Sequence, residues 1–102
     1  MRLEQLEYFV AAADAGAIST AAQRLGISQP AVSAAVRSLE NELGSHLLKR
    51  GNSGVSLTPL GRLTYRDARA ILELAQSIQA RGKAWRPEDR WPYARNPCCR
   101  FI

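Results

Sequence analysis

The sequence has no long apolar run, and no stretch approaches the roughly 20 apolar residues that a membrane-spanning helix needs. Its 102 residues are 46% hydrophobic and 23% charged, which is the balance of an ordinary soluble globular protein. No secretory signal is visible, because Met1 leads directly into an acidic, amphipathic segment. The length, composition and missing signals predict one cytoplasmic domain without a membrane partner.

Residues that often carry catalysis or hold metals are scarce. Cysteine occurs only at the adjacent positions Cys98 and Cys99, a spacing that suits neither a disulfide framework nor a zinc site. His46 is the single histidine, and no cysteine or carboxylate accompanies it at the spacing of a metal site or a catalytic triad. No glycine-rich phosphate loop precedes a helix. We therefore expect no enzyme activity, no metal and no cofactor.

Charge is distributed unevenly along the chain, which has a net charge of +5. Residues 1–14 contain one basic and three acidic residues, a net charge of −2, whereas residues 15–66 contain six basic and two acidic residues, a net charge of +4. A basic excess suits a polyanion such as DNA, and a solvated basic surface is an equally common origin of it. Charge alone leaves both interpretations open.

Hydrophobic periodicity predicts two helices within the first 25 residues. The core-facing side of the first helix, over residues 3–14, is expected to consist of Leu3, Leu6, Val10 and Ala13, with Phe9 at its edge. Gly16 takes the position of a helix C-terminal glycine, and a shorter helix over residues 18–25 ends in the same way at Gly26. Glycine thus separates two short helices.

A third helix is predicted over residues 29–42, because Ser28 is a good N-cap and Pro30 suits the first helical turn. Its expected buried stripe consists of Val32, Ala35, Val36, Leu39 and Leu43. The opposite arc carries mainly small or polar side chains, namely Pro30, Ser33, Ala34, Arg37, Ser38 and Asn41. Small side chains let a helix sink into a DNA major groove, so the second and third helices predict a helix-turn-helix. The alternative is that this arc covers another protein surface.

Two strand-like stretches, residues 47–50 and 55–58, are separated by the turn-forming sequence GNSG. They predict a small β-hairpin, or wing. Thr58 then caps a fourth helix that begins at Pro59 and continues to about residue 80. The expected fold class is mainly α: a winged helix-turn-helix with a three-helix core and a hairpin, followed by a long linker helix.

The fourth helix is apolar over more of its circumference than one small domain usually covers. In particular, we do not expect Ala68 and Leu72 to be buried by the chain's own three helices. A second copy of the chain is the simplest explanation. The predicted dimerisation residues are Leu63, Ala68, Ile71, Leu72, Ala75 and Ile78.

The C-terminal segment differs in composition from the rest of the chain. Residues 82–102 contain three of the five prolines and both tryptophans, with no helical or strand period. We expect an irregular or disordered tail there. The predicted organisation is a DNA-binding domain over residues 1–58, a linker and dimerisation helix over residues 59–81, and a tail over residues 82–102.

Three segments resemble the N-terminal DNA-binding domain of LysR-type transcriptional regulators: LEYFVAAADAG, AAQRLGISQPAVSAAVRSLENELGSHLLKR and VSLTPLG. The resemblance covers residues 1 to about 80. It implies a winged helix-turn-helix and a linker helix that pairs with the same helix of a second subunit. Members of this family carry an effector domain after that helix, for which 102 residues leave no room, so we expect no small-molecule effector. Ala17 departs from the serine that similar members often use to cap the second helix.

The resemblance implies a recognition role for the third helix. Glutamine can form two hydrogen bonds with adenine, serine can bond several bases, and alanine or proline can meet a thymine methyl group. Serines at helix starts suit phosphate contact, although capping explains Ser28 equally well. The predicted DNA-binding residues are Ser19, Ser28, Gln29, Pro30, Ser33, Ala34, Arg37, Lys49 and Arg50.

The resulting prediction is sequence-specific binding of double-stranded DNA by a homodimeric, bacterial-type transcriptional regulator. The alternative is a truncated regulator that acts only as a dimerisation or interaction module through its fourth helix.

Overall fold

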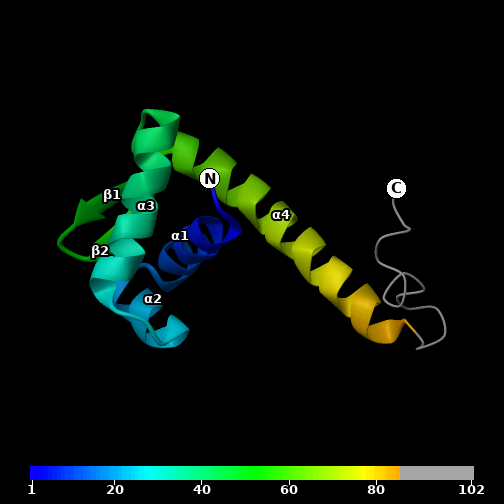
Figure 1. Cartoon of the computed structure of the whole chain (residues 1–102). Helices are drawn as coiled ribbons and strands as arrows, with labels where there is room; N and C mark the ends of the chain where they lie inside the picture. Colours follow the sequence, from blue (N-terminus) through cyan, green and yellow to red (C-terminus); the bar gives the residue numbers. More distant parts are fainter. Residues whose placement is uncertain (86–102) are drawn as a thin grey trace.

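A computed structural model describes residues 1–85 of the chain (Figure 1). Its elements, in order, are α1 (Leu3–Ala15), α2 (Ile18–Leu25), α3 (Gln29–Leu43), β1 (Leu48–Gly51), β2 (Gly54–Leu57) and α4 (Pro59–Ala84). Figure 1 shows the first three helices and the hairpin gathered into one body, from which α4 extends outward. The mainly helical winged helix-turn-helix fold with a long fourth helix is therefore confirmed.

Capping residues and glycines set the helix ends as predicted. The hydroxyl oxygen of Ser28 accepts a hydrogen bond from the backbone N–H three residues later, at 3.3 Å, and Thr58 does the same for α4 at 2.9 Å. Gly16, Gly26 and Gly44 follow α1, α2 and α3 in the left-handed conformation. These interactions are local in sequence, so each of these boundaries follows from a few neighbouring residues.

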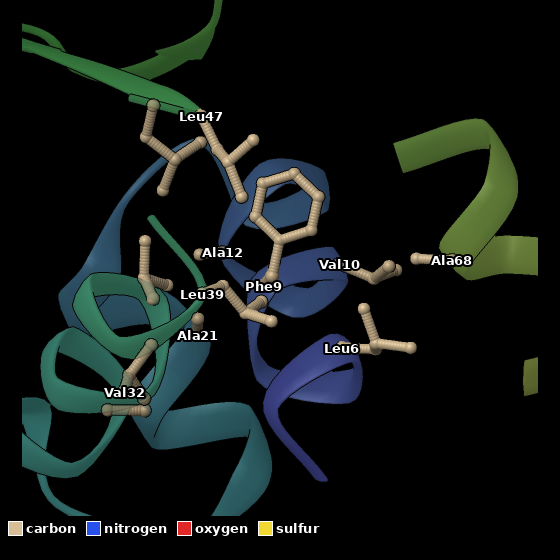
Figure 2. Close-up of a cluster of buried hydrophobic side chains, with 12 residues drawn as sticks. Leu6, Phe9, Val10, Ala12, Ala21, Val32, Leu39, Leu47 and Ala68 are labelled. Atoms are coloured by element: carbon tan, nitrogen blue, oxygen red, sulfur yellow. The ribbon is translucent and has the colours of Figure 1, made fainter. Parts of the chain in front are cut away.

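The hydrophobic core lies where α1, α2 and α3 meet (Figure 2). The largest fully buried side chains are Phe9, Leu39, Leu47, Val32 and Val36. The expectation that Phe9 lies at the edge of the buried face is wrong, because it is fully buried at the centre. Leu3 and Leu43, expected inside, are 52% and 44% exposed. The buried side of α1 does not include Leu3, because other elements of the chain pack against α1 from more than one direction.

One of those neighbours is α4, which packs its first half along α1. Ala68 is only 1% exposed, and Figure 2 shows it facing Leu6 and Val10 of α1. Leu72, one turn later, is half-buried against the same core. The expectation that the chain's own helices leave these two residues uncovered is therefore wrong. The methyl side chain of Ala68 allows α4 to approach α1 closely, which a periodicity argument on α4 alone does not reveal.

The end of α4 also differs from the prediction. The helix continues to Ala84, so residues 82–84 are helical although the sequence predicted an irregular tail from residue 82. Gly82 has open space around it and does not interrupt the helix. The rest of the predicted tail, residues 86–102, lies outside the described residues. Within residues 1–85, no helix is both long enough and apolar enough to cross a bilayer.

The hairpin is antiparallel, and backbone hydrogen bonds close its open end and attach it to the helical body. Leu48 lies opposite Leu57, and Lys49 lies opposite Ser56. The Val55 N–H donates to the Gly16 carbonyl at 2.9 Å, and the backbone N–H of the residue after β2 donates to the Leu47 carbonyl at 3.0 Å. The first bond joins the wing to the turn between α1 and α2, so the position of the wing depends on that turn.

Candidate nucleic-acid interface

The N-terminal half of α3 presents the side chains that the sequence assigned to base recognition. Gln29, Pro30, Ala34 and Arg37 are exposed, and Ser33 is half-buried. Val32 and Val36, on the other side of the same helix, are buried in the core. The structure thus brings the predicted recognition residues together on one outward arc. The small side chains of Pro30, Ser33 and Ala34 leave the helix backbone close to the molecular surface.

The start of α2 offers backbone N–H groups rather than a capped terminus. Ala17 occupies the N-cap position and forms no side-chain cap, as the sequence predicted. Ser19 lies exposed in the first turn. Because the first N–H groups of a helix have no intrahelical partner, an uncapped terminus can receive an anion such as a phosphate. Ser28, at the start of α3, is exposed and caps that helix through its hydroxyl oxygen.

The wing presents Lys49 and Arg50, both exposed on β1. Leu47 and Leu48, just before them in the chain, are buried and anchor the strand in the core. One carboxylate oxygen of Glu40 also accepts hydrogen bonds from the backbone N–H groups of these leucines, at 2.9 and 3.3 Å. Sequence reasoning missed this role for Glu40. No local signal identifies it, because the partners lie seven and eight residues away across a loop.

A shallow hollow of about 620 Å³ separates α3 from the wing. Its lining residues are Val36, Arg37, Glu40, His46, Leu48, Lys49, Arg50 and Thr58. Basic side chains from the recognition helix and from the wing therefore share one surface. Among residues 1–85, no group of three or more histidine, cysteine or acidic side chains lies close enough together to hold a metal ion.

A second polar cluster joins α1 to α4 on another side of the molecule. The Tyr65 hydroxyl donates to Asp14 Oδ1, and Arg69 Nη1 donates to that hydroxyl at 3.1 Å. Arg69 also lies 3.5 Å from the carboxylate of Glu73. The hydrogen bond to Tyr65 is the largest cause of a raised pKa for Arg69. These contacts set how α4 leaves the helical body. The sequence does not reveal them, because Asp14 and Tyr65 lie 51 positions apart in the chain.

An apolar stripe on α4 stays uncovered in the single chain. It consists of Leu63, Ile71, Leu74 and Ile78, which are 53%, 37%, 66% and 62% exposed. On a helix of 3.6 residues per turn, these positions lie about 60–140° around the helix from Ala68, which faces α1. Asp67 lies in the middle of the stripe with an exposed carboxylate 4.0 Å from Arg66.

Of the six predicted dimerisation residues, only three belong to this stripe: Leu63, Ile71 and Ile78. Ala68 is buried within its own chain. Leu72 and Ala75 are half-buried and line a groove between α4 and α1. Leu74 is the most exposed large apolar residue of the stripe, although it was not among the predicted dimerisation residues.

Comparison with known proteins shows which family shares the helix-turn-helix and the wing. The family model described as "Bacterial regulatory helix-turn-helix protein, lysR family" matches residues 3–62, which include the recognition helix and the wing. The chain belongs to the LysR family. The sequence-based resemblance to this family is therefore confirmed.

Relatives of the chain include bacterial proteins named as transcriptional regulators or activators. The chain is 44% identical over 84 residues to the HTH-type transcriptional regulator TfdT of Cupriavidus pinatubonensis, which covers 82% of this chain and 37% of TfdT. It is 43% identical over 90 residues to the Hca operon transcriptional activator HcaR of Escherichia coli, which covers 88% of this chain and 30% of HcaR. The chain thus spans well under half the length of these LysR relatives.

Solved LysR structures have the same fold. The DNA-binding domain of CbnR in complex with DNA superposes with a TM-score of 0.77 at 44% identity, over 82% of this chain and 97% of that domain. The DNA-binding domain of BenM on catB site 1 DNA superposes with a TM-score of 0.78 at 37% identity, over 81% of this chain and 92% of that domain. Both similar domains were solved on DNA.

Proposed function

We propose that this chain binds double-stranded DNA with sequence preference and acts as a transcriptional regulator in the bacterial cytoplasm. One observation carries the proposal: the exposed arc of α3 lies beside an exposed basic wing, in a fold shared with two domains solved on DNA. The names of the relatives, which are regulators and activators of transcription, support a role without catalysis.

Within this proposal, each part of the surface has a distinct task. The α3 residues Gln29, Pro30, Ser33 and Ala34 face base edges in the major groove, because base edges carry the sequence information there. Arg37 lies further along the same arc and reaches bases or backbone. The phosphate contacts come from Ser19, Ser28, Lys49 and Arg50.

We further propose that two copies of the chain pair through α4. The support is the uncovered stripe of Leu63, Ile71, Leu74 and Ile78, since an apolar stripe of this kind is typical of a surface that contacts another protein. Pairing brings a second recognition helix onto the same duplex. Once the first subunit is bound, the second binds as if within one molecule, which can raise the apparent affinity for DNA by roughly 10²- to 10⁴-fold.

The test begins with selection of bound sequences from a random pool of duplexes by the purified chain. Gln29→Ala is then expected to cost about 1–3 kcal/mol on the selected site and much less on random DNA, because a bidentate base contact discriminates by that amount. Gln79→Ala is the matched control, because this glutamine lies far along α4, away from the recognition arc. Equal losses on both DNAs would show that Gln29 does not read sequence.

The selection experiment also separates this function from the alternative of a pure interaction module. Such a module would pair with another copy through α4 but would enrich no DNA sequence. Failure of the wild-type chain to enrich any site, while it sediments as a dimer, would favour the module and refute the proposed function.

A further inference from the structure

Asp67 is an acidic residue in the middle of the apolar stripe on α4, and neither the core nor the DNA interface uses it. Its side chain is 73% exposed and lies 4.0 Å from Arg66, at the limit of an ion pair. Leu63 and Ile71, one turn before and after it, are 53% and 37% exposed. A carboxylate that becomes covered in a subunit interface is costly unless a cation meets it there.

The stripe continues past Ile78 to Arg81 and Trp85, at the end of α4 that projects beyond the helical body (Figure 1). On a helix of 3.6 residues per turn, these two positions lie within the same arc of about 80° as Asp67 and the four apolar residues of the stripe. Arg81 is exposed, and Trp85 is 56% exposed. The Trp85 N–H donates to the Arg81 carbonyl at 3.1 Å, so the chain still follows the helix there. The stripe thus has an acid toward one end and a base toward the other.

We propose that two copies of α4 pair in antiparallel orientation and in one register, in which Asp67 of each copy forms an ion pair with Arg81 of the partner subunit. This inference rests on the pairing of subunits in the proposed function, and it specifies how the two helices align. Residues 67 and 81 lie equally far from residue 74, so this alignment places Leu74 on the twofold axis. Because a twofold axis repeats each contact, the dimer contains two such ion pairs.

The same alignment matches apolar residues along the rest of the stripe. Leu63 lies opposite Trp85 of the partner subunit, and Ile71 lies beside Ile78 of the partner subunit. Leu74, the most exposed large apolar residue of the stripe, meets its own copy at the centre. One alignment therefore covers the apolar residues that the single chain exposes and matches both charges.

Other alignments leave a charge against an apolar side chain or against a like charge. A shift by one helical turn, about 5.4 Å along the axis, places Asp67 opposite Ile78 or Trp85 of the partner subunit. A parallel pair in register places the two Asp67 carboxylates against each other, where they repel. A polar residue at one position of a helix seam is known to select register in this way, at some cost in stability.

The first test locates the twofold axis by disulfide formation, in a chain that carries Cys98→Ser and Cys99→Ser. Leu74→Cys is expected to form a covalent dimer under mild oxidation, because the two copies of this residue face each other. Ile71→Cys is the matched control, because its two copies lie about 9 Å apart along the axis in this register. That separation exceeds the Cα distance of roughly 7 Å that a disulfide tolerates. Cross-linking of Ile71→Cys as fast as Leu74→Cys, or of neither, refutes the register.

The second test exchanges the two charges. Asp67→Arg and Arg81→Asp are each expected to raise the dissociation constant of the dimer about 10- to 100-fold, because each replaces two ion pairs with two repulsive contacts. The double variant has opposite charges across the interface again and is expected to dimerise like the wild type. An equimolar mixture of the two single variants is expected to form heterodimers for the same reason. Sedimentation velocity measures all four cases.

Lys83→Asp is the matched control for Arg81→Asp, because it makes the same change of charge in the last turn of α4. Lys83 lies roughly 160° around the helix from the centre of the stripe. We expect its dissociation constant to stay within about twofold of the wild-type value. Circular dichroism confirms that each variant keeps its helical fold.

The outcomes distinguish this inference from the proposed function. If the wild-type chain is a dimer but the double variant stays as weak as the single variants, the ion pair and the register are refuted while pairing stands. If the wild-type chain is a monomer at tens of micromolar, pairing through α4 and this inference are both overturned. Selection of DNA sequences from the random pool reports separately on DNA binding.

Discussion

Replacement of Gly54 by alanine tests how the wing is held in place. Gly54 has φ +119°, a conformation that side chains with a Cβ rarely adopt. A Cβ at this position would lie 2.1 Å from the Gly16 carbonyl oxygen and 3.3 Å from its carbon. That oxygen also accepts the Val55 N–H at 2.9 Å. The substitution therefore forces either the hairpin or the turn after α1 to move.

The expected cost follows from these two effects. Backbone strain of this kind costs about 1–3 kcal/mol. Loss of the hydrogen bond between Val55 and Gly16 adds about 0.5–1.5 kcal/mol. We expect Gly54→Ala to lower the free energy of unfolding by about 2–4 kcal/mol. For a domain of this size, the melting temperature would fall by roughly 10–30 °C.

Gly51→Ala is the matched control, because it changes the other end of the same hairpin turn. An added Cβ there meets no atom within 4 Å, and φ lies outside the left-handed range. We expect its free energy of unfolding to stay within about 0.5 kcal/mol of the wild-type value. Urea unfolding followed by circular dichroism, at one fixed chain concentration, compares the variants, since pairing makes stability depend on concentration. Equal stability of the two variants would refute the contact between the wing and the α1–α2 turn.

Two further predictions concern the wing and the stripe on α4. Arg50→Ala is expected to lower affinity for every DNA sequence and to reduce the salt slope by roughly one unit, as for a phosphate contact; an unchanged slope would exclude Arg50 from the interface. Ile78→Glu is expected to shift the chain from dimer to monomer in sedimentation at tens of micromolar, because pairing would bury an unpaired carboxylate. Ala80→Glu adds the same charge off the stripe and is expected to stay dimeric; a dimeric Ile78→Glu variant would show that the stripe does not pair subunits.

The choice of Ile78 over Leu72 shows why tertiary structure matters for such tests. Leu72 is half-buried against the chain's own core, so a charge there would destabilise the fold as well as any dimer. Ile78 is 62% exposed in the single chain, so a charge there acts mainly on what covers the stripe. Periodicity places both residues on the apolar side of α4 and does not separate these two cases.

The sequence by itself was sufficient for features that depend on short-range interactions. Ser28, Thr58 and the glycines after the first three helices act on backbone groups within a few residues, so the ends of the first three helices and the start of α4 followed from the sequence. The outward arc of α3 was also predictable, because 3.6-residue periodicity fixes which side chains share a face. These local rules, together with the family motifs, led to the winged helix-turn-helix.

Only the tertiary structure decided which neighbour covers each face. The same α1 helix packs against α3 and α4, and this places Phe9 at the centre, leaves Leu3 exposed and buries Ala68. Glu40 receives two backbone N–H groups of the wing, and Gly16 lies against Gly54, only because the folded chain brings distant segments together. Periodicity gives the direction in which a side chain points from its own helix. It does not say what lies there, because that depends on contacts between residues far apart in sequence.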